Sequence, residues 1–288
     1  VKSIVLDSNG REVTSFQATG IVKAGALDTL TQVSSPISSP KLWSPSSPYV
    51  YKVRTEVYNG PDLVDTYESP LGFRTVEWTK DRGFLLNGTR VWLQGANVHQ
   101  DHAGWGDAIA NTGAYRDVKL IKEAGMNFIR GSHYPHSSAF SEACDKLGVM
   151  LWSEATFWGT MAEPSGWKSG AYPTNAGVMA AFDASALSQL AEMIRIHRNH
   201  PSIIIWSMGN EQFFTRNLTG SKSLLTKMQN HAKQLDPSHP VGGGGVQKNG
   251  LDQLVDIAGY NGDGAINFID PGRPSMVAEY GSCAPTRG

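Results

Sequence analysis

The stretch NHPSIIIWSMGNE, residues 199–211, decides the fold of this chain. Its apolar run, residues 202–208, is rich in β-branched and aromatic side chains, which is typical of a strand buried on both faces in a parallel sheet. Asn210 and Glu211 follow this run. Because ligands bind at the carboxyl ends of strands in parallel α/β folds, the pair predicts a functional site. The alternative is a helix N-cap, since Asn caps helices well and Glu suits a first turn.

Runs of the same kind recur from about residue 82 onward. The strand-like runs are VWLQGANV, MNFIRGSHY, VMLWSEA, SIIIWSMGNE, HPVGGGG, VDIAGYNG and PSMVAEYG. Helical patterns such as AYRDVKLIKEAG and SSAFSEACDKLG lie between them and end in glycine. This α/β alternation predicts a (β/α)8 TIM barrel rather than a doubly wound sheet. Seven strands are found and the eighth is missing, so we expect a barrel truncated before strand eight.

Residues 1–78 have a different pattern of short alternating runs separated by turns. Asn59-Gly60 is the clearest hairpin signal, and several such turns in succession predict an all-β, immunoglobulin-like sandwich. The Pro- and Ser-rich segment 34–48 has the composition of a linker, but Trp43 within it predicts a loop that packs on its own domain. We therefore expect a sandwich domain at 1–78 and a barrel domain at 79–288.

The composition of the chain argues against some classes of binding partner. A formal net charge of -1 over 288 residues argues against nucleic acid or an anionic membrane as the main partner. No apolar run approaches the ~20 residues that a membrane span needs. Cys144 and Cys283 cannot form a disulfide framework and lack metal-ligand spacing. The chain starts within a strand pattern and shows no signal peptide, so we expect a piece of a longer protein whose compartment is unknown.

Polar side chains follow nearly every predicted strand, and in a barrel they would face one mouth. These strand ends are Asn97 to Asp101, Arg130 to Tyr134, Glu154, Asn210 with Glu211, Tyr260 with Asn261, and Glu279 with Tyr280. Two or three carboxylates in one mouth suit the work of a general acid, a base and a nucleophile.

A metal-dependent barrel hydrolase is the alternative to acid–base chemistry. Its candidate ligands are His99, Asp101, His102, His133 and His136. The first strand lacks a His-x-His pair, and no lysine or aspartate completes such a site. The glycine run at 242–245 is not a phosphate loop, because no Gly-Lys-Ser/Thr follows it. It is interpreted as a tight end of a barrel strand.

Several segments together carry a family resemblance. They are GFLLNGTRVWLQGANVHQD, IRGSHYPHSSAFSEACDKLGVMLWSE, NHPSIIIWSMGNE and MVAEYG, with SPKLWSPSSPYVYKV and LGFR before them. The chain thereby resembles glycoside hydrolase family 2, which contains β-galactosidases, β-glucuronidases and β-mannosidases. The resemblance implies a retaining, exo-acting β-glycosidase that hydrolyses terminal β-linked sugars of an oligosaccharide or polysaccharide by double displacement. If it acts on polysaccharide, a secreted or periplasmic location is favoured.

The resemblance also implies roles for individual residues. Glu211 matches the acid/base and Glu279 the nucleophile. A retaining enzyme needs these carboxyl groups about 5–5.5 Å apart, and the charge of Glu279 would help to keep Glu211 protonated. Asn210 would hydrogen-bond the sugar hydroxyl beside the anomeric carbon. The other implied substrate-binding residues are His99, His133, Tyr134, Glu154, Trp158 and Tyr260.

Some of these residues also have a structural interpretation. Glu154 could serve only to brace Arg130 or a histidine, and His133 and Tyr134 could simply end a strand. Trp158 is a better stacking platform for a sugar than Trp152, which lies within a strand and is expected in the core.

The sugar specificity is inferred from the charged residues at the strand ends. We expect a β-galactosidase, because no Arg or Lys among the available strand ends obviously awaits a sugar carboxylate. The alternatives are a β-glucuronidase, another specificity of the family, or a truncated, inactive fragment that only binds carbohydrate through a barrel with an open edge.

We expect no cofactor. We also expect no metal ion, because the positions that bind one in some β-galactosidases of the family hold Trp158 and Thr160. Any oligomer would form through regions missing from this sequence.

Overall fold

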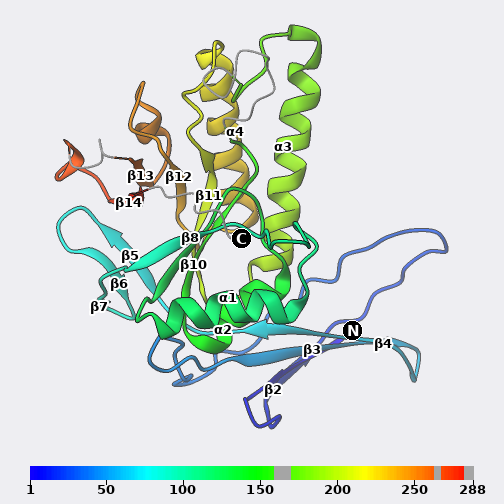
Figure 1. Cartoon of the computed structure of the whole chain (residues 1–288). Coiled ribbons are helices and arrows are strands. Elements are labelled where there is room, and N and C mark those ends of the chain that lie inside the picture. Colours follow the sequence, from blue (N-terminus) through cyan, green and yellow to red (C-terminus); the bar gives the residue numbers. More distant parts are fainter. Residues whose placement is uncertain (159–169, 263–266, 282–288) are drawn as a thin grey trace.

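The computed structural model describes residues 1–158, 170–262 and 267–281, and it divides into an amino-terminal sheet and a barrel-like sheet covered by helices (Figure 1). The larger sheet has seven strands in the order β14-β13-β12-β11-β10-β9-β8, with all neighbours parallel. The strands are β8 (Gly95–Val98), β9 (Phe128–Gly131), β10 (Met150–Glu154), β11 (Ile203–Asn210), β12 (Val241–Gly244), β13 (Ile257–Asn261) and β14 (Ser275–Glu279). All seven predicted strands are confirmed, and β8 and β14 are the two edges of the sheet.

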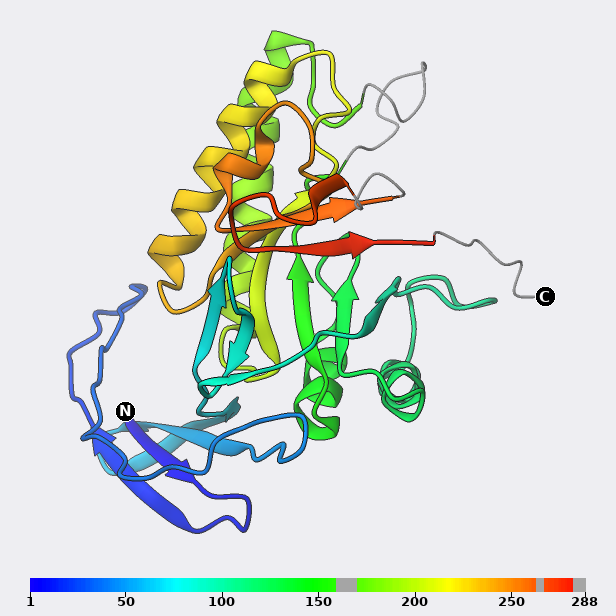
Figure 2. The same ribbon diagram turned by 90° about the vertical axis from the view of Figure 1, so that its left-hand side faces the viewer.

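Four α-helices cover the outer face of this sheet. They are α1 (Asn111–Glu123), α2 (Ser138–Leu147), α3 (Ala176–His197) and α4 (Leu218–Leu235), and a 3-10 turn, η1 (Leu251–Leu254), precedes β13. Figure 2 shows α3 and α4 side by side along the sheet. The large apolar core lies between the sheet and these helices, and in β11 every residue is buried, as the NHPSIIIWSMGNE stretch predicts. Within the described residues, no helix is both long and apolar enough to cross a membrane.

A second apolar cluster fills the amino-terminal end of the barrel. It joins Trp152 from inside the barrel to the first residues of several strands, among them Phe128 and Met150, and to Phe84 and Leu86. Phe84 and Leu86 belong to a small sheet of β5 (Val76–Thr79), β6 (Gly83–Leu86) and β7 (Thr89–Arg90). This small sheet therefore packs across the base of the barrel.

The amino-terminal domain is all-β, as predicted. It contains β1 (Lys2–Leu6), β2 (Glu12–Gln17), β3 (Tyr51–Asn59) and β4 (Asp62–Leu71) in one antiparallel sheet of order β2-β1-β3-β4. The predicted sandwich needs a second sheet, and the described residues of this domain form only one. The predicted boundary after residue 78 falls within β5, which pairs with β6 on the barrel side.

Trp43 corrects the prediction made for its loop. It does not pack only on its own domain, because its fully buried indole belongs to the cluster at the base of the barrel. Its Nε1 donates a hydrogen bond to the backbone oxygen of Asp145 on α2 (2.9 Å). Lys122 on α1 donates to the backbone oxygens of Pro45 and Gly148 (3.0 and 3.1 Å). The Pro- and Ser-rich segment is therefore a docking element between the two parts of the chain.

This docking gives a first prediction. Replacing Trp43 with Ala should lower the free energy of unfolding by about 3–5 kcal/mol, because it leaves a large cavity and an unpaired carbonyl. Denaturant unfolding of the chain measures the change. Trp92, whose side chain is 71 % exposed, is the matched control, and Trp92→Ala should cost less than about 0.5 kcal/mol. Equal losses in the two variants would contradict the docking role.

Candidate active site

Arg130 is the centre of a polar cluster at the carboxyl ends of the barrel strands. It lies on β9 and is fully buried. Its Nε and Nη2 donate to the two carboxylate oxygens of Glu154 on β10 (3.0 and 2.9 Å). Its Nη1 donates to Oε1 of Glu279 on β14 (2.7 Å), and Nη2 also contacts Oδ1 of Asn210 on β11 (2.9 Å). One guanidinium thus links four strands, including two whose sequence positions are 149 residues apart.

Glu154 braces this cluster and has no surface left for a ligand. Besides Arg130, its oxygens accept from Trp152 Nε1 and Ser207 Oγ (both 2.9 Å), and His133 Nδ1 lies 2.7 Å away. Burial raises the pKa of Glu154, but the Arg130 charge and the His133 and Ser207 hydrogen bonds outweigh it and lower the pKa to about 2. The contacts of Glu154 therefore fit a role in bracing Arg130 and His133, and they do not fit a role in binding substrate. Trp152 is fully buried, as expected.

Glu211 stands directly after β11 and is partly open to solvent. Its φ of 50° lies in the left-handed region, which non-glycine residues rarely adopt and which clusters at functional sites. Asn261 Nδ2 donates to Glu211 Oε1 (3.3 Å) and to Asn210 Oδ1 (3.0 Å). Burial is the main cause that raises the pKa of Glu211, and the charge of Glu279 adds to it. A carboxyl group with a raised pKa stays protonated longer as pH rises, which suits a general acid.

The N-cap interpretation of Asn210 and Glu211 is excluded by the next helix. That helix, α4, begins only at Leu218, and its N-cap is Asn217, whose side chain accepts from the backbone N–H of Gly220. Asn210 instead closes a strand and points its amide into the polar cluster.

Glu279 is the last residue of β14, and its side chain is 25 % exposed. Arg130 Nη1 lies 2.7 Å and His133 Nε2 3.8 Å from the same oxygen, Oε1. The carboxylate is therefore held from one side by cationic and polar groups while part of it faces solvent. A nucleophile needs both features: a fixed orientation and access to substrate.

A wall of rings stands beside the two glutamates. Trp158 lies 4.5 Å from His133 between ring centroids, and His99 lies 5.2 Å from His133. The Tyr134 hydroxyl is 3.4 Å from His99 Nδ1 and accepts from the backbone N–H of Gln100 (2.9 Å). The structure thus brings together four of the predicted sugar-contact residues, and burial lowers the pKa of His99, which favours its neutral form.

Tyr260 requires a correction. Its ring stacks on Phe268 at 4.2 Å within the core between sheet and helices, and its hydroxyl donates to Asp252 (3.4 Å). Burial, with the nearby Asp252 charge, raises the pKa of Tyr260 to about 12. Because successive strand residues point to opposite faces, the neighbouring Asn261 is the one that contacts Glu211. Strand alternation was the sequence signal that could have identified Asn261.

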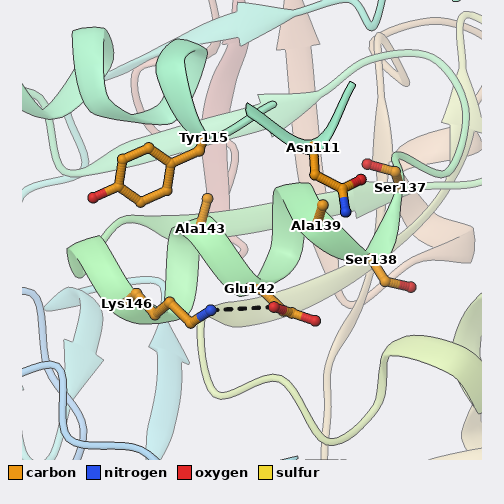
Figure 3. Close-up of a pocket in the computed structure, with 8 residues that line it drawn as sticks. All are labelled: Asn111, Tyr115, Ser137, Ser138, Ala139, Glu142, Ala143 and Lys146. Atoms are coloured by element: carbon orange, nitrogen blue, oxygen red, sulfur yellow. Dashed lines mark hydrogen bonds and ion pairs between the residues drawn. The ribbon is translucent and has the colours of Figure 1, made fainter. Parts of the chain in front are cut away.

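Other features lie away from this cluster. A hollow of about 330 Å³ lies between α1 and α2. Figure 3 shows the residues that line it: Asn111, Tyr115, Ser137, Ser138, Ala139, Glu142, Ala143 and Lys146. None of the predicted site residues lines it. In the part of the chain that the structure describes, no group of three or more His, Cys, Asp or Glu side chains could hold a metal ion. Thr160 and Cys283 lie outside the described residues.

Two protein-family models match parts of this chain. Residues 77–261 match the family model "Glycosyl hydrolases family 2, TIM barrel domain", and residues 1–74 match "Glycosyl hydrolases family 2". The two matches are separated by residues 75–76, at the start of β5.

Individual relatives include two kinds of enzyme. A β-glucuronidase of Bacteroides fragilis is 31 % identical over 89 % of this chain and 36 % of its own length. A β-galactosidase of Bacteroides ovatus is 29 % identical over 100 % of this chain and 37 % of its own length. The crystal structure of a Bacteroides uniformis β-glucuronidase superposes with a TM-score of 0.85 at 28 % identity, covering 99 % of this chain and 36 % of that one. The chain therefore spans little more than a third of the length of these relatives.

The Arg130–Glu154 pair gives a prediction for stability. Glu154→Gln should lower the free energy of unfolding by about 3–5 kcal/mol at pH 7, because it leaves a buried charge less well paired. The folded-state pKa of about 2 lies below the ordinary 4.5, so the stabilisation is complete above pH 4.5 and is lost as pH falls towards 2. Urea unfolding of the chain from pH 7 to 3 should show this acid loss in the unsubstituted chain and a flatter profile in the variant.

The control for this prediction is an exposed ion pair. Glu77 and Arg82 lie 2.6 Å apart with side chains 53 % and 60 % exposed. Glu77→Gln should change stability by less than about 1 kcal/mol. If Glu154→Gln behaved like Glu77→Gln, Glu154 would not brace the site.

Proposed function

The chain belongs to glycoside hydrolase family 2, and we propose that it carries the catalytic carboxylates of a retaining, exo-acting β-glycosidase. The observation that supports this most is the hydrogen-bonded line from Glu279 through Arg130, Asn210 and Asn261 to Glu211. It joins two partly accessible carboxyl groups, one at the end of β14 and one directly after β11, in one polar site, and burial raises the pKa of Glu211. Carboxyl groups in unlike environments suit an acid and a nucleophile.

In the proposed first step, Glu279 attacks the anomeric carbon while Glu211 protonates the leaving oxygen. The bond between the anomeric carbon and the leaving oxygen breaks, and a glycosyl ester forms on Glu279. Arg130 and His133 hold the attacking carboxylate from one side, so its orientation is set before substrate binds. Glu211 suits the acid role because burial and the charge of Glu279 both favour its protonated form.

In the proposed second step, Glu211 acts as a base. It takes a proton from water, the water oxygen attacks the anomeric carbon, and Glu279 leaves as a free carboxylate. Asn210 supports both steps. Its Oδ1 accepts from Arg130 and Asn261, which leaves its Nδ2 to donate to the sugar hydroxyl beside the anomeric carbon.

Substrate contacts are assigned to the ring wall and not to every predicted residue. Trp158 offers an aromatic face, and His99, His133 and Tyr134 offer polar atoms around it. We place Glu154 among the supporting residues, since its oxygens are already taken, and replace Tyr260 with Asn261.

For the sugar itself we propose a β-galactoside. Each nitrogen of the Arg130 guanidinium already donates to Glu154, Glu279 or Asn210, so this cation has little capacity for a sugar carboxylate. A β-glucuronide is the second candidate, because a β-glucuronidase of Bacteroides fragilis and one of Bacteroides uniformis are among the relatives. The two candidates share the same reaction and differ in the configuration at C4 and in the group at C6.

The mechanism predicts distinct behaviour for the two glutamates in the full-length enzyme. Glu279→Gln should abolish the covalent adduct with a 2-deoxy-2-fluoro glycoside, because the attacking carboxylate is gone. Glu211→Ala should lower turnover of poorly activated substrates by about 10²–10⁴-fold and be partly rescued by azide with activated ones. Mass spectrometry of the adduct and azide titration measure these effects. An adduct that still forms on Glu279→Gln would rule out the proposed nucleophile.

A panel of aryl β-glycosides tests the substrate. The galactoside should give the highest kcat/KM, and the glucuronide should be at least about tenfold poorer, since one unmatched charged group costs more than 1.4 kcal/mol. The matched comparison is the glucoside, which tests the C4 hydroxyl without adding charge. Preferred turnover of the glucuronide would replace β-galactosidase with β-glucuronidase.

A further inference from the structure

Strand β12 is unusual because three of its four residues are glycines, Gly242 to Gly244. A fourth glycine, Gly245, follows the strand, and all four glycines are buried. Glycine weakens a strand, since it loses more backbone entropy on folding and has no side chain to pack. A run of glycines in a central barrel strand therefore needs a reason in its surroundings.

The reason at Gly244 is the space occupied by Arg130. A Cβ placed on Gly244 would lie 2.2 Å from Arg130 Nη2 and 2.9 Å from Asn210 Oδ1, both closer than real side chains allow. The backbone of Gly244 does not have a positive φ, so its conformation alone would permit another residue. Only the neighbouring side chains exclude a methyl group there.

Arg130 cannot simply retreat from this position. Its Nε and Nη2 make the two-point contact with Glu154, whose oxygens are also bound by Trp152 and Ser207. The guanidinium is planar and rigid, so moving Nη2 also moves Nη1 away from Glu279. The space at Gly244 and the contact with Glu154 thus both restrict where the guanidinium can lie.

Other glycines of the strand have different neighbours. On the face that points to the helices, a Cβ on Gly243 would lie 2.8 Å from Val246 Cγ1, with Val255 as its next contact. On the barrel side, Gly242 faces Ile205 and Trp152. Gly245 faces Glu211 Cγ at 2.5 Å, but its positive φ of 59° would confound any substitution. Gly244 is therefore the position where the effect of space on Arg130 can be isolated.

We propose that Gly244 is a positioning residue of the active site: its missing side chain fixes the Arg130 guanidinium where it orients both Glu279 and Asn210. The proposal rests on the glycosidase function proposed above. Gly244 has no side chain, so it acts on the reaction entirely through Arg130.

The test is a double-mutant cycle in the full-length enzyme with Gly244→Ala and Arg130→Lys. Gly244→Ala alone should lower kcat about 10²-fold while KM changes less than about threefold, because a misplacement near 1 Å of a positioned group costs that much. In the Arg130→Lys background, which has no Nη2, the same substitution should lower kcat less than about threefold further. Equal effects in both backgrounds would overturn the proposal.

Gly243→Ala is the matched control, because it adds the same methyl group to the same strand on the opposite face. It should lower the melting temperature and leave kcat within about threefold. If Gly243→Ala lost as much kcat as Gly244→Ala, the effect would be a general weakening of β12 and the proposal would fail.

A crystal structure of the Gly244→Ala chain tests the geometry without any activity. Arg130 Nη2 should move away from residue 244 and lose its contact with Asn210 Oδ1. An Arg130 in its original place would overturn the proposal even if kcat fell. An enzyme that hydrolyses none of the glycosides would instead refute the proposed function, while this structural measurement would still decide the role of Gly244.

Discussion

The buried ion pair between Arg130 and Glu154 is the constraint on which the candidate site depends. Neither side chain has any exposed surface, so each charge would be very costly without the other. Once the pair is formed, the remaining N–H groups of the guanidinium donate to Glu279 and Asn210. Because the buried pair fixes the guanidinium, it also fixes the orientation of Glu279 and Asn210, the two groups that the proposed reaction needs.

The interior of the barrel is shaped around these large side chains. Trp152 and Arg130 come from neighbouring strands and point inward, and Trp152 also donates to Glu154. The opposite wall supplies little volume. A Cβ on Gly242 or Gly259 would lie 3.2 or 3.1 Å from the Trp152 ring. Large residues on one side and glycines on the other fill the barrel at close packing, as interiors require.

The amino-terminal sheet is attached at the other end of the same strands. Trp43 belongs to the same cluster as Trp152, and a Cβ on Gly72 would overlap Pro201, which lies two residues before the start of β11. Arg74 donates to the backbone oxygen of Ile203 and contacts His239 Nε2 (2.6 Å). The base of the barrel is therefore closed by segments from the first 90 residues, while the candidate site stays at the far end.

The sequence by itself determined the seven strands, their parallel order and the end of the sheet where Glu211, Glu279 and Asn210 lie. Apolar runs, helical spacing and glycine stops are local signals, and the rule that parallel strands gather their carboxyl ends on one edge does the rest. Tertiary structure alone decided which polar side chains face each other. A pairing of Arg130 with Glu154 was one of the interpretations that the sequence left open, but nothing local indicated that Arg130 would also contact Glu279 and Asn210, because those contacts join residues 149 and 80 positions apart. Strand alternation separates Tyr260 from Asn261, but the packed strand decided that Tyr260 faces the helices and Asn261 faces Glu211.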